Sequence, residues 1–151
     1  MTAELSDLYQ EVILDHQKSP RNYGTLDEPD GHADGANPLC GDRVTVHVKI
    51  HDGVATDVRF QGVGCAICTS SASMMTTRVK GKSLEEIDGL FSSFHDLLTG
   101  DAAPGDDTPT LGKLKIFEGV RNFPIRVKCA TLPWHTLRAA ILGVDEAVTT
   151  E

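Results

Sequence analysis

The stretch that decides the fold is VTVHVKIHDGVATDVRFQ, residues 44–61. Apolar and polar residues alternate on both sides of Asp52-Gly53, with the period of two that predicts a pair of half-buried β-strands. A two-residue turn at Asp52-Gly53 would put the two apolar sets on opposite faces of the hairpin. We therefore expect a three-residue turn, His51-Asp52-Gly53, which pairs Ile50 with Val54 and brings both apolar sets to one face.

Helices are predicted on both sides of this hairpin. The spacing of Leu5, Leu8, Val12 and their neighbours predicts an amphipathic helix that ends near Lys18, because Ser19-Pro20 disfavours further helix. After the hairpin, residues 65–80 are rich in Ala, Ser, Thr and Met and predict a helix lying close to the sheet. Gly81 suits its C-terminal cap.

The second half of the chain continues with helices. The capping box Ser83-Leu84-Glu85-Glu86 predicts a helix start, and a short helix is expected near residues 111–120. The last helix should begin close to Cys129, because Pro133 is tolerated only in a first turn. Residues 20–42, rich in Gly, Pro, Asp and Asn, predict an extended loop. The expected fold class is α+β, a small antiparallel sheet with helices on one face.

The composition is that of one soluble globular domain spanning residues 1–151. Of the 151 residues 40% are hydrophobic and 24% charged, which excludes a disordered tail. The net charge is −8 and there is no Lys/Arg-rich stretch, so no nucleic-acid partner is expected. No apolar run approaches the roughly 20 residues of a membrane helix. The opening Met1-Thr2-Ala3-Glu4 lacks the layout of a signal peptide, and a cytoplasmic location is expected.

Three of the four cysteines lie at predicted element ends. Cys40 precedes a strand, Cys65 follows a Gly-rich bend at a helix start, and Cys129 is expected to start the last helix. Asp42 can bring a carboxylate beside Cys40 across Gly41. Three thiolates and one carboxylate form a four-ligand set that zinc accepts in tetrahedral geometry. The alternative is that each cysteine is a small buried hydrophobic residue.

The remaining candidate ligands are weaker. Cys68 lies a turn into a helix of small residues, where packing accounts for it. The six histidines lie at polar or boundary positions of helices, on the polar face of a strand, or in a loop. His135 is near Cys129 in the sequence, but a solvated side chain is expected there.

Several motifs together resemble one known family, the U-type iron–sulfur cluster assembly proteins (IscU, the NifU N-terminal domain and SufU). The resemblance covers roughly residues 5–143 and rests on five motifs: Asn37-Pro38-Leu39-Cys40-Gly41-Asp42, Gly62-Val63-Gly64-Cys65-Ala66-Ile67, Ala72-Ser73-Met74-Met75-Thr76, Lys80-Gly81-Lys82 and Arg126-Val127-Lys128-Cys129-Ala130-Thr131-Leu132. It implies an IscU/SufU-like α+β fold.

Within the family, the chain is similar to the SufU branch. The IscU type carries His immediately before its third cysteine, where this chain has Lys128, and residues 99–122 look like the insertion typical of SufU. The resemblance implies a zinc-bound sulfur acceptor working with a SufS-type cysteine desulfurase, with zinc held by the four residues named above as ligands: Cys40, Asp42, Cys65 and Cys129. Cys40 would accept the persulfide.

Charge near this site supports such chemistry. Arg126 and Lys128 place positive charge beside Cys129, which would favour an anionic persulfide. Two other functions remain open: a scaffold that assembles a [2Fe–2S] cluster on the three cysteines with Asp42, and a zinc-stabilised interaction domain without sulfur chemistry. Downstream iron–sulfur assembly proteins are further expected partners, and the domain is not expected to turn over alone.

Overall fold

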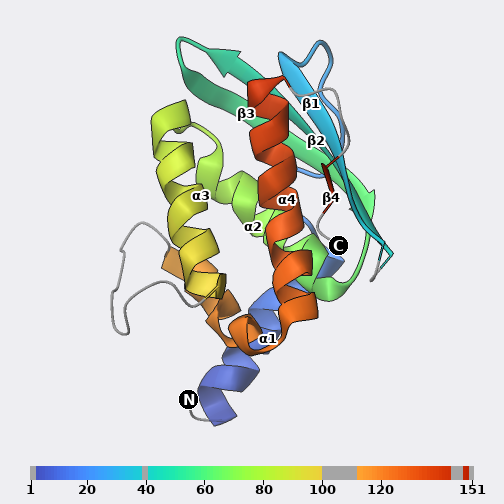
Figure 1. Ribbon diagram of the computed structural model, residues 1–151, viewed down its shortest axis with the longest axis vertical. Helices are drawn as coiled ribbons and strands as arrows, with labels where there is room; N and C mark the ends of the chain where they lie inside the picture. Colours follow the sequence, from blue (N-terminus) through green and yellow to red (C-terminus); the bar gives the residue numbers. More distant parts are fainter. Residues whose placement is uncertain (1–2, 39–40, 100–111, 144–147, 150–151) are drawn as a thin grey trace.

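The structure is a computed structural model that describes residues 3–38, 41–99, 112–143 and 148–149. Its elements, in chain order, are α1 (Ala3–Lys18), β1 (Gly31–Asn37), β2 (Asp42–His51), β3 (Val54–Val63), α2 (Ala66–Val79), α3 (Leu84–Thr99), the 3₁₀ helix η1 (Gly112–Asn122), α4 (Pro124–Leu142) and β4 (Val148–Thr149). The expected α+β class is confirmed: helices pack on one face of a small sheet (Figure 1).

The sheet has the strand order β3-β2-β1-β4. β1, β2 and β3 are antiparallel, and the two-residue β4 runs parallel to β1 along its outer edge. The outer edge of β3 is met at Phe60 by a bridge from Tyr23. Inner-face side chains of β2 and β3 are buried: Val44, Val46, Val48, Val58 and Phe60. α4 lies across β1 and β2, and α2 packs against β3 (Figure 1).

The strand β1 corrects the expectation of a continuous loop over residues 20–42. Its sequence, GHADGAN, contains two glycines and no large apolar residue. The glycines are explained by α4, whose backbone comes so close that a Cβ at Gly31 would lie 2.1 Å from the Ala140 carbonyl oxygen. A Cβ at Gly35 would lie 2.1 Å from Thr136 Oγ1. Close approach of a helix therefore accounts for residues that, in isolation, indicate a loop.

The β2–β3 hairpin corrects the expected register. Asp52 and Gly53 both have positive φ, 51° and 74°, and form a two-residue turn of the kind that Asp-Gly favours. Ile50 therefore pairs with Ala55, not with Val54. A bulge then follows: Lys49 pairs with Asp57, which leaves Thr56 as the extra residue. The bulge shifts β3 by one residue and so brings the apolar residues of both strands to the same face of the hairpin. Val48 lies opposite Val58, and Val46 opposite Phe60.

The helix α4 begins five residues earlier than expected. Pro124 occupies its first turn, and Pro133 lies in its interior. Pro133 has no N–H to donate to the carbonyl of Cys129, four residues earlier, so the helix continues despite one missing ladder bond. Burial of its side chains against the sheet and α2 outweighs that loss, since most of the helix from Cys129 onward is buried. The prediction was wrong because it placed Pro133 in the first turn of the helix, a position that Pro124 occupies.

Other predicted boundaries are confirmed. α1 ends at Lys18, and α2 ends at Val79 with Gly81 at a φ of 85°. The capping box is formed: the backbone N–H of Glu86 donates to Ser83 Oγ at 3.1 Å. The expected short helix is present as η1, which adds buried side chains to the core: Leu114, Ile116, Phe117 and Val120. Among the described residues, no helix is both long and apolar enough to cross a membrane.

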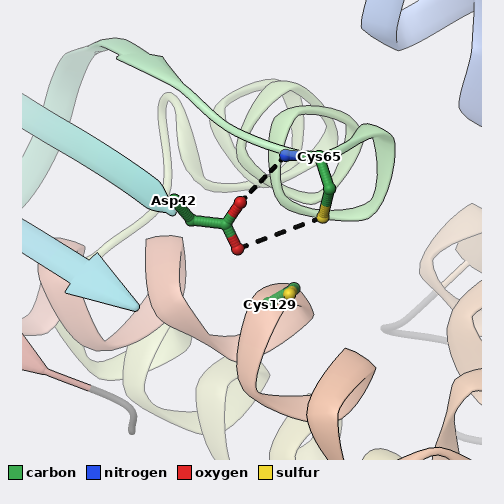
Figure 2. A group of neighbouring side chains, drawn as sticks. All are labelled: Asp42, Cys65 and Cys129. Atoms are coloured by element: carbon green, nitrogen blue, oxygen red, sulfur yellow. Dashed lines mark hydrogen bonds between the residues drawn. The ribbon is translucent and has the colours of Figure 1, made fainter. Parts of the chain in front are cut away.

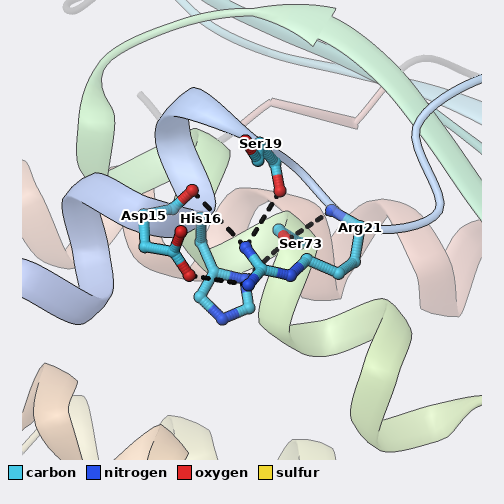
Figure 3. A network of polar contacts seen from close by, with 5 residues as sticks. All are labelled: Asp15, His16, Ser19, Arg21 and Ser73. Carbon is cyan, nitrogen blue, oxygen red and sulfur yellow. Dashed lines mark hydrogen bonds and ion pairs between the residues drawn. The ribbon is translucent and has the colours of Figure 1, made fainter.

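A polar network attaches the end of α1 to α2 (Figure 3). The buried Ser73 hydroxyl on α2 lies 2.7 Å from His16 Nδ1 and accepts the backbone N–H of Arg21 at 2.8 Å. The Arg21 guanidinium in turn forms an ion pair with Asp15 at 2.6 Å. A single serine of α2 thus forms hydrogen bonds with both the last turn of α1 and the segment that follows it.

Candidate metal centre

Three side chains from distant parts of the sequence meet at one end of the sheet (Figure 2). Asp42 begins β2, Cys65 precedes α2, and Cys129 lies in the second turn of α4. One ligand atom of each, a carboxylate oxygen and two Sγ atoms, lies within 4.8 Å of the others. The sheet, α2 and α4 therefore place three of the four predicted ligands together.

The Asp42 carboxylate is buried and held by the backbone of Cys65. Asp42 is 1% exposed, and its Oδ1 accepts the Cys65 N–H at 2.9 Å, while Oδ2 lies 4.0 Å from Cys65 Sγ. Gly64 makes room for this arrangement, because a Cβ there would approach Asp42 Oδ1 to 2.7 Å. The Gly-rich bend thus lets the carboxylate reach the sulfur.

Cys65 is the N-cap of α2, as expected for a cysteine at a helix start. Its Sγ accepts the backbone N–H of Cys68 at 3.4 Å, and its backbone is extended. The sulfur therefore lies at the N-terminal end of α2, beside the first backbone N–H groups of the helix. Cys65 is half-buried, whereas the other two described cysteines, Cys68 and Cys129, are buried.

Cys129 does not start a helix, which corrects the expectation drawn from the sequence. It is fully buried, at 0% exposure, because α4 begins at Pro124 and carries it beneath the end of the sheet. Its Sγ accepts a hydrogen bond from Asn37 Nδ2 at 3.5 Å. Asn37 was missed as a site residue because an amide neither titrates nor commonly ligates zinc. Its place in the Asn37–Asp42 motif was the available signal.

The donor set fits a zinc ion. Zinc takes thiolate ligands at about 2.3 Å and carboxylate oxygens at about 2.0 Å, which puts neighbouring ligand atoms of a tetrahedron about 3.5–3.8 Å apart. The three described atoms, within 4.8 Å of one another, would close by about 1 Å to reach that geometry. Two sulfurs and one oxygen leave a fourth position, as in zinc sites that admit another ligand.

The family comparison agrees with this arrangement. A model of the NifU-like N-terminal domain matches residues 8–130. The chain belongs to this family. This U-type chain is 41% identical over 139 residues to the zinc-dependent sulfurtransferase SufU of Bacillus subtilis. The match covers 92% of this chain and 92% of the relative. It is 40% identical to an iron–sulfur cluster assembly scaffold protein IscU of Streptococcus pyogenes, over 92% of this chain and 86% of the relative.

A solved structure shares the U-type fold. The crystal structure described as an iron–sulfur cluster assembly scaffold for the SUF system, FiSufU from Fervidobacterium islandicum AW-1, superposes with a TM-score of 0.81 at 33% identity. The match covers 87% of this chain and 94% of that one. The resemblance drawn from the sequence motifs, including the SufU branch, is confirmed.

The other predicted site residues take different places in the U-type domain. Cys40 lies outside the described residues, as does the 100–111 part of the proposed 99–122 insertion. Cys68 is 3% exposed and packs in the core, as expected. Arg126 is exposed and Lys128 half-buried, both on the turn of α4 that leads to Cys129.

None of the six histidines, all of which are described, joins the Asp42, Cys65 and Cys129 group. His135 is half-buried, which corrects the expectation of a solvated side chain. Its ring packs edge-on against Phe91 at 5.1 Å and lies 6.0 Å from His95. Burial lowers the pKa of His135, and the nearby His95 and Arg138 lower it further.

Proposed function

We propose that this U-type protein is a zinc-bound sulfur acceptor that works with a SufS-type cysteine desulfurase in iron–sulfur cluster biosynthesis. The observation that carries the proposal is the convergence of Asp42, Cys65 and Cys129 within 4.8 Å. The name of the Bacillus subtilis relative, a zinc-dependent sulfurtransferase, supports it. So does Lys128, which stands where the IscU type has a histidine available to a cluster.

The proposed ligands are Asp42, Cys65, Cys129 and, from the sequence, Cys40. Bound zinc would keep the thiols deprotonated at neutral pH. Asp42 is the one oxygen ligand, and carboxylate is a harder donor than thiolate, so it is the proposed exchangeable position. Cys65 and Cys129 belong to helices packed against each other, which suits them to remain as ligands.

The proposed transfer step uses Cys40 as nucleophile. Its thiolate attacks the outer sulfur of the persulfide on the desulfurase; a new S–S bond forms at Cys40, and the bond from that sulfur to the desulfurase cysteine breaks. The desulfurase cysteine leaves as a thiolate, so charge and oxidation level are conserved overall. Arg126 and Lys128 would stabilise the anionic persulfide on Cys40 by Coulomb attraction.

The test combines metal analysis with sulfur transfer. Protein purified without added metal should be colourless and contain one zinc per chain. After incubation with desulfurase and cysteine, mass spectrometry should find the added sulfur on the peptide that contains Cys40, and only when desulfurase is present. Sulfur chiefly on Cys129 would overturn the choice of acceptor.

The second candidate is a [2Fe–2S] assembly scaffold, which the similarity to proteins named scaffold IscU favours. The same three cysteines with Asp42 would then carry the cluster. A brown, iron-containing protein that contains no zinc would decide for the scaffold. A zinc protein that accepts no sulfur would decide for a zinc-stabilised interaction domain. A cytoplasmic location and further assembly partners remain predictions.

A further inference from the structure

Asn37 is a buried amide placed against the site. It ends β1, is 0% exposed, and is paired across the ladder with Asp42, the first residue of β2. Both side chains reach the metal centre from the same end of the sheet: Asp42 contacts Cys65, and Asn37 Nδ2 lies 3.5 Å from Cys129 Sγ. Each residue of this cross-strand pair therefore forms a hydrogen bond with a different cysteine, Asp42 with Cys65 and Asn37 with Cys129.

Burial of an amide has a cost unless its polar atoms are satisfied, so the position needs a reason. The neighbouring inward positions of β1 are Ala33 and Gly35, and at Gly35 a Cβ would collide with Thr136 of α4. At Asn37 the strand instead carries a polar side chain whose N–H meets a sulfur. An N–H donor stabilises negative charge on a sulfur and lowers its electron density.

The two described cysteines of the metal centre both accept an N–H bond at sulfur. Cys65 Sγ accepts the backbone N–H of Cys68 at 3.4 Å, and Cys129 Sγ accepts the side-chain N–H of Asn37 at 3.5 Å. A sulfur that accepts such a bond is a weaker nucleophile and a firmly held ligand. Of the two donors, only Asn37 can be removed by a side-chain substitution.

We propose that Asn37 is a positioning residue that keeps Cys129 as a retained, unreactive ligand, so that incoming sulfur is directed to Cys40. This inference rests on the proposed function, since it concerns which thiol of that site reacts. Asn37 acts through its N–H···S bond to Cys129 and does not touch the persulfide.

The test compares Asn37→Ala with Ser71→Ala in the full chain. Ser71 is equally buried and bonds the carbonyl of Ala130, the residue after Cys129, but no described sulfur. Ser71→Ala therefore controls for lost packing and a lost buried hydrogen bond near the same turn of α4. Both variants are loaded with zinc and treated with limiting iodoacetamide, and the alkylated cysteines are quantified by peptide mapping.

In Asn37→Ala, alkylation of Cys129 should rise about tenfold or more, as expected when a charged hydrogen bond is lost. In Ser71→Ala it should stay near the wild-type rate. Cobalt(II) supplies a second readout: the sulfur-to-cobalt charge-transfer band should move to longer wavelength in Asn37→Ala only. If Asn37→Ala does not fold, Asn37→Leu, which keeps a similar volume but has no donor and no charge, takes its place and should show the same changes.

Two failures are distinguishable. If wild-type protein binds zinc and passes sulfur to Cys40, but Asn37→Ala behaves like Ser71→Ala in both readouts, the role of Asn37 is wrong and the proposed function stands. If wild-type protein binds neither zinc nor cobalt at Cys129, the proposed function and the inference fall together.

Discussion

Asp42 serves the site in two ways that require different properties of its side chain. Its Oδ1 accepts the Cys65 N–H at 2.9 Å, which any well-placed oxygen could do. Its proposed ligand role needs a negative charge, because a neutral amide oxygen is a poor zinc ligand beside thiolates. Substitutions that separate these properties therefore reveal what the carboxylate contributes to each.

Asp42→Asn should keep the hydrogen bond but weaken the hold on zinc, so zinc exchange with a chelator becomes faster with little loss of stability. Asp42→Ala should also speed exchange and, in addition, lose about 1–3 kcal/mol of unfolding free energy, because the Cys65 N–H is left unsatisfied. Chelator competition and urea unfolding of the metal-free protein measure the two effects. Unchanged exchange in both variants would leave Asp42 with only its structural bond.

The two cysteines of the Cys65–Cys68 pair should respond oppositely to serine. Cys65→Ser preserves the helix N-cap, since serine is a preferred capping residue, so the metal-free fold should be intact while zinc is lost. Cys68→Ser places a hydroxyl in the core and should cost about 1 kcal/mol of stability, yet retain one zinc per chain. Elemental analysis with thermal unfolding separates the outcomes, and equal zinc loss in both would refute the ligand assignment.

At the scale of elements, the β2–β3 hairpin depends on a backbone conformation as much as on its apolar residues. Gly53→Ala should destabilise the protein by about 1 kcal/mol, because the φ of 74° is a left-handed conformation that alanine disfavours. Gly89→Ala is the matched control. It lies within α3 with open space where a Cβ would go, and should stabilise by about 0.5–1 kcal/mol. Denaturant midpoints measure both changes, and a neutral Gly53→Ala would argue against the two-residue turn.

Local signals in the sequence predicted several elements correctly, and contacts between distant segments explain the rest. The capping box at Ser83 and the stop at Lys18 depend on neighbouring residues and could be predicted. β1 could not, because Gly31 and Gly35 are required by the approach of α4, more than a hundred residues away. The bulge at Thr56 likewise depends on the core, because it allows Val58 and Phe60 to be buried, which a regular register would not.

The site shows the same division. Asp42 was singled out by its spacing from Cys40, and Cys65 and Cys129 as cysteines at predicted helix starts. The structure brings these three together, although Cys129 does not start its helix. The burial of Cys129 and its bond from Asn37 could not be predicted, because both follow from where α4 crosses the end of β1. Ligand chemistry is visible in residue types, whereas the groups that orient the ligands become visible only in the packing.

At the scale of the whole molecule, the α3–α4 contact should make stability depend on pH. The pKa of His135 lies below its usual value of 6.5, chiefly because of burial. Above that pH the ring is neutral in both the folded and the unfolded chain. As pH falls through 6.5, the unfolded chain binds a proton that the folded state resists, so the free energy of unfolding decreases.

His135→Gln should remove this component. Metal-free wild-type protein should lose stability between pH 7.5 and pH 5.5, and the variant should lose less over the same interval, although packing against Phe91 is weakened at both pH values. Urea unfolding at the two pH values gives the difference directly. An equal loss in both proteins would exclude His135 as the group responsible.

The short strand β4 has a consequence for how copies of the protein meet one another. Its two residues pair with Gly35 and Ala36 on the outside of β1, just as Tyr23 meets Phe60 on the outside of β3. Each edge strand of the sheet, β1 and β3, thus pairs at its outer side with a short segment of the same chain. An edge strand with unpaired backbone N–H and C=O groups can pair with a strand of another chain. Removal of the residues after Gly143 should therefore leave the fold standing but turn a monodisperse preparation into one that self-associates through β1, which sedimentation velocity would detect.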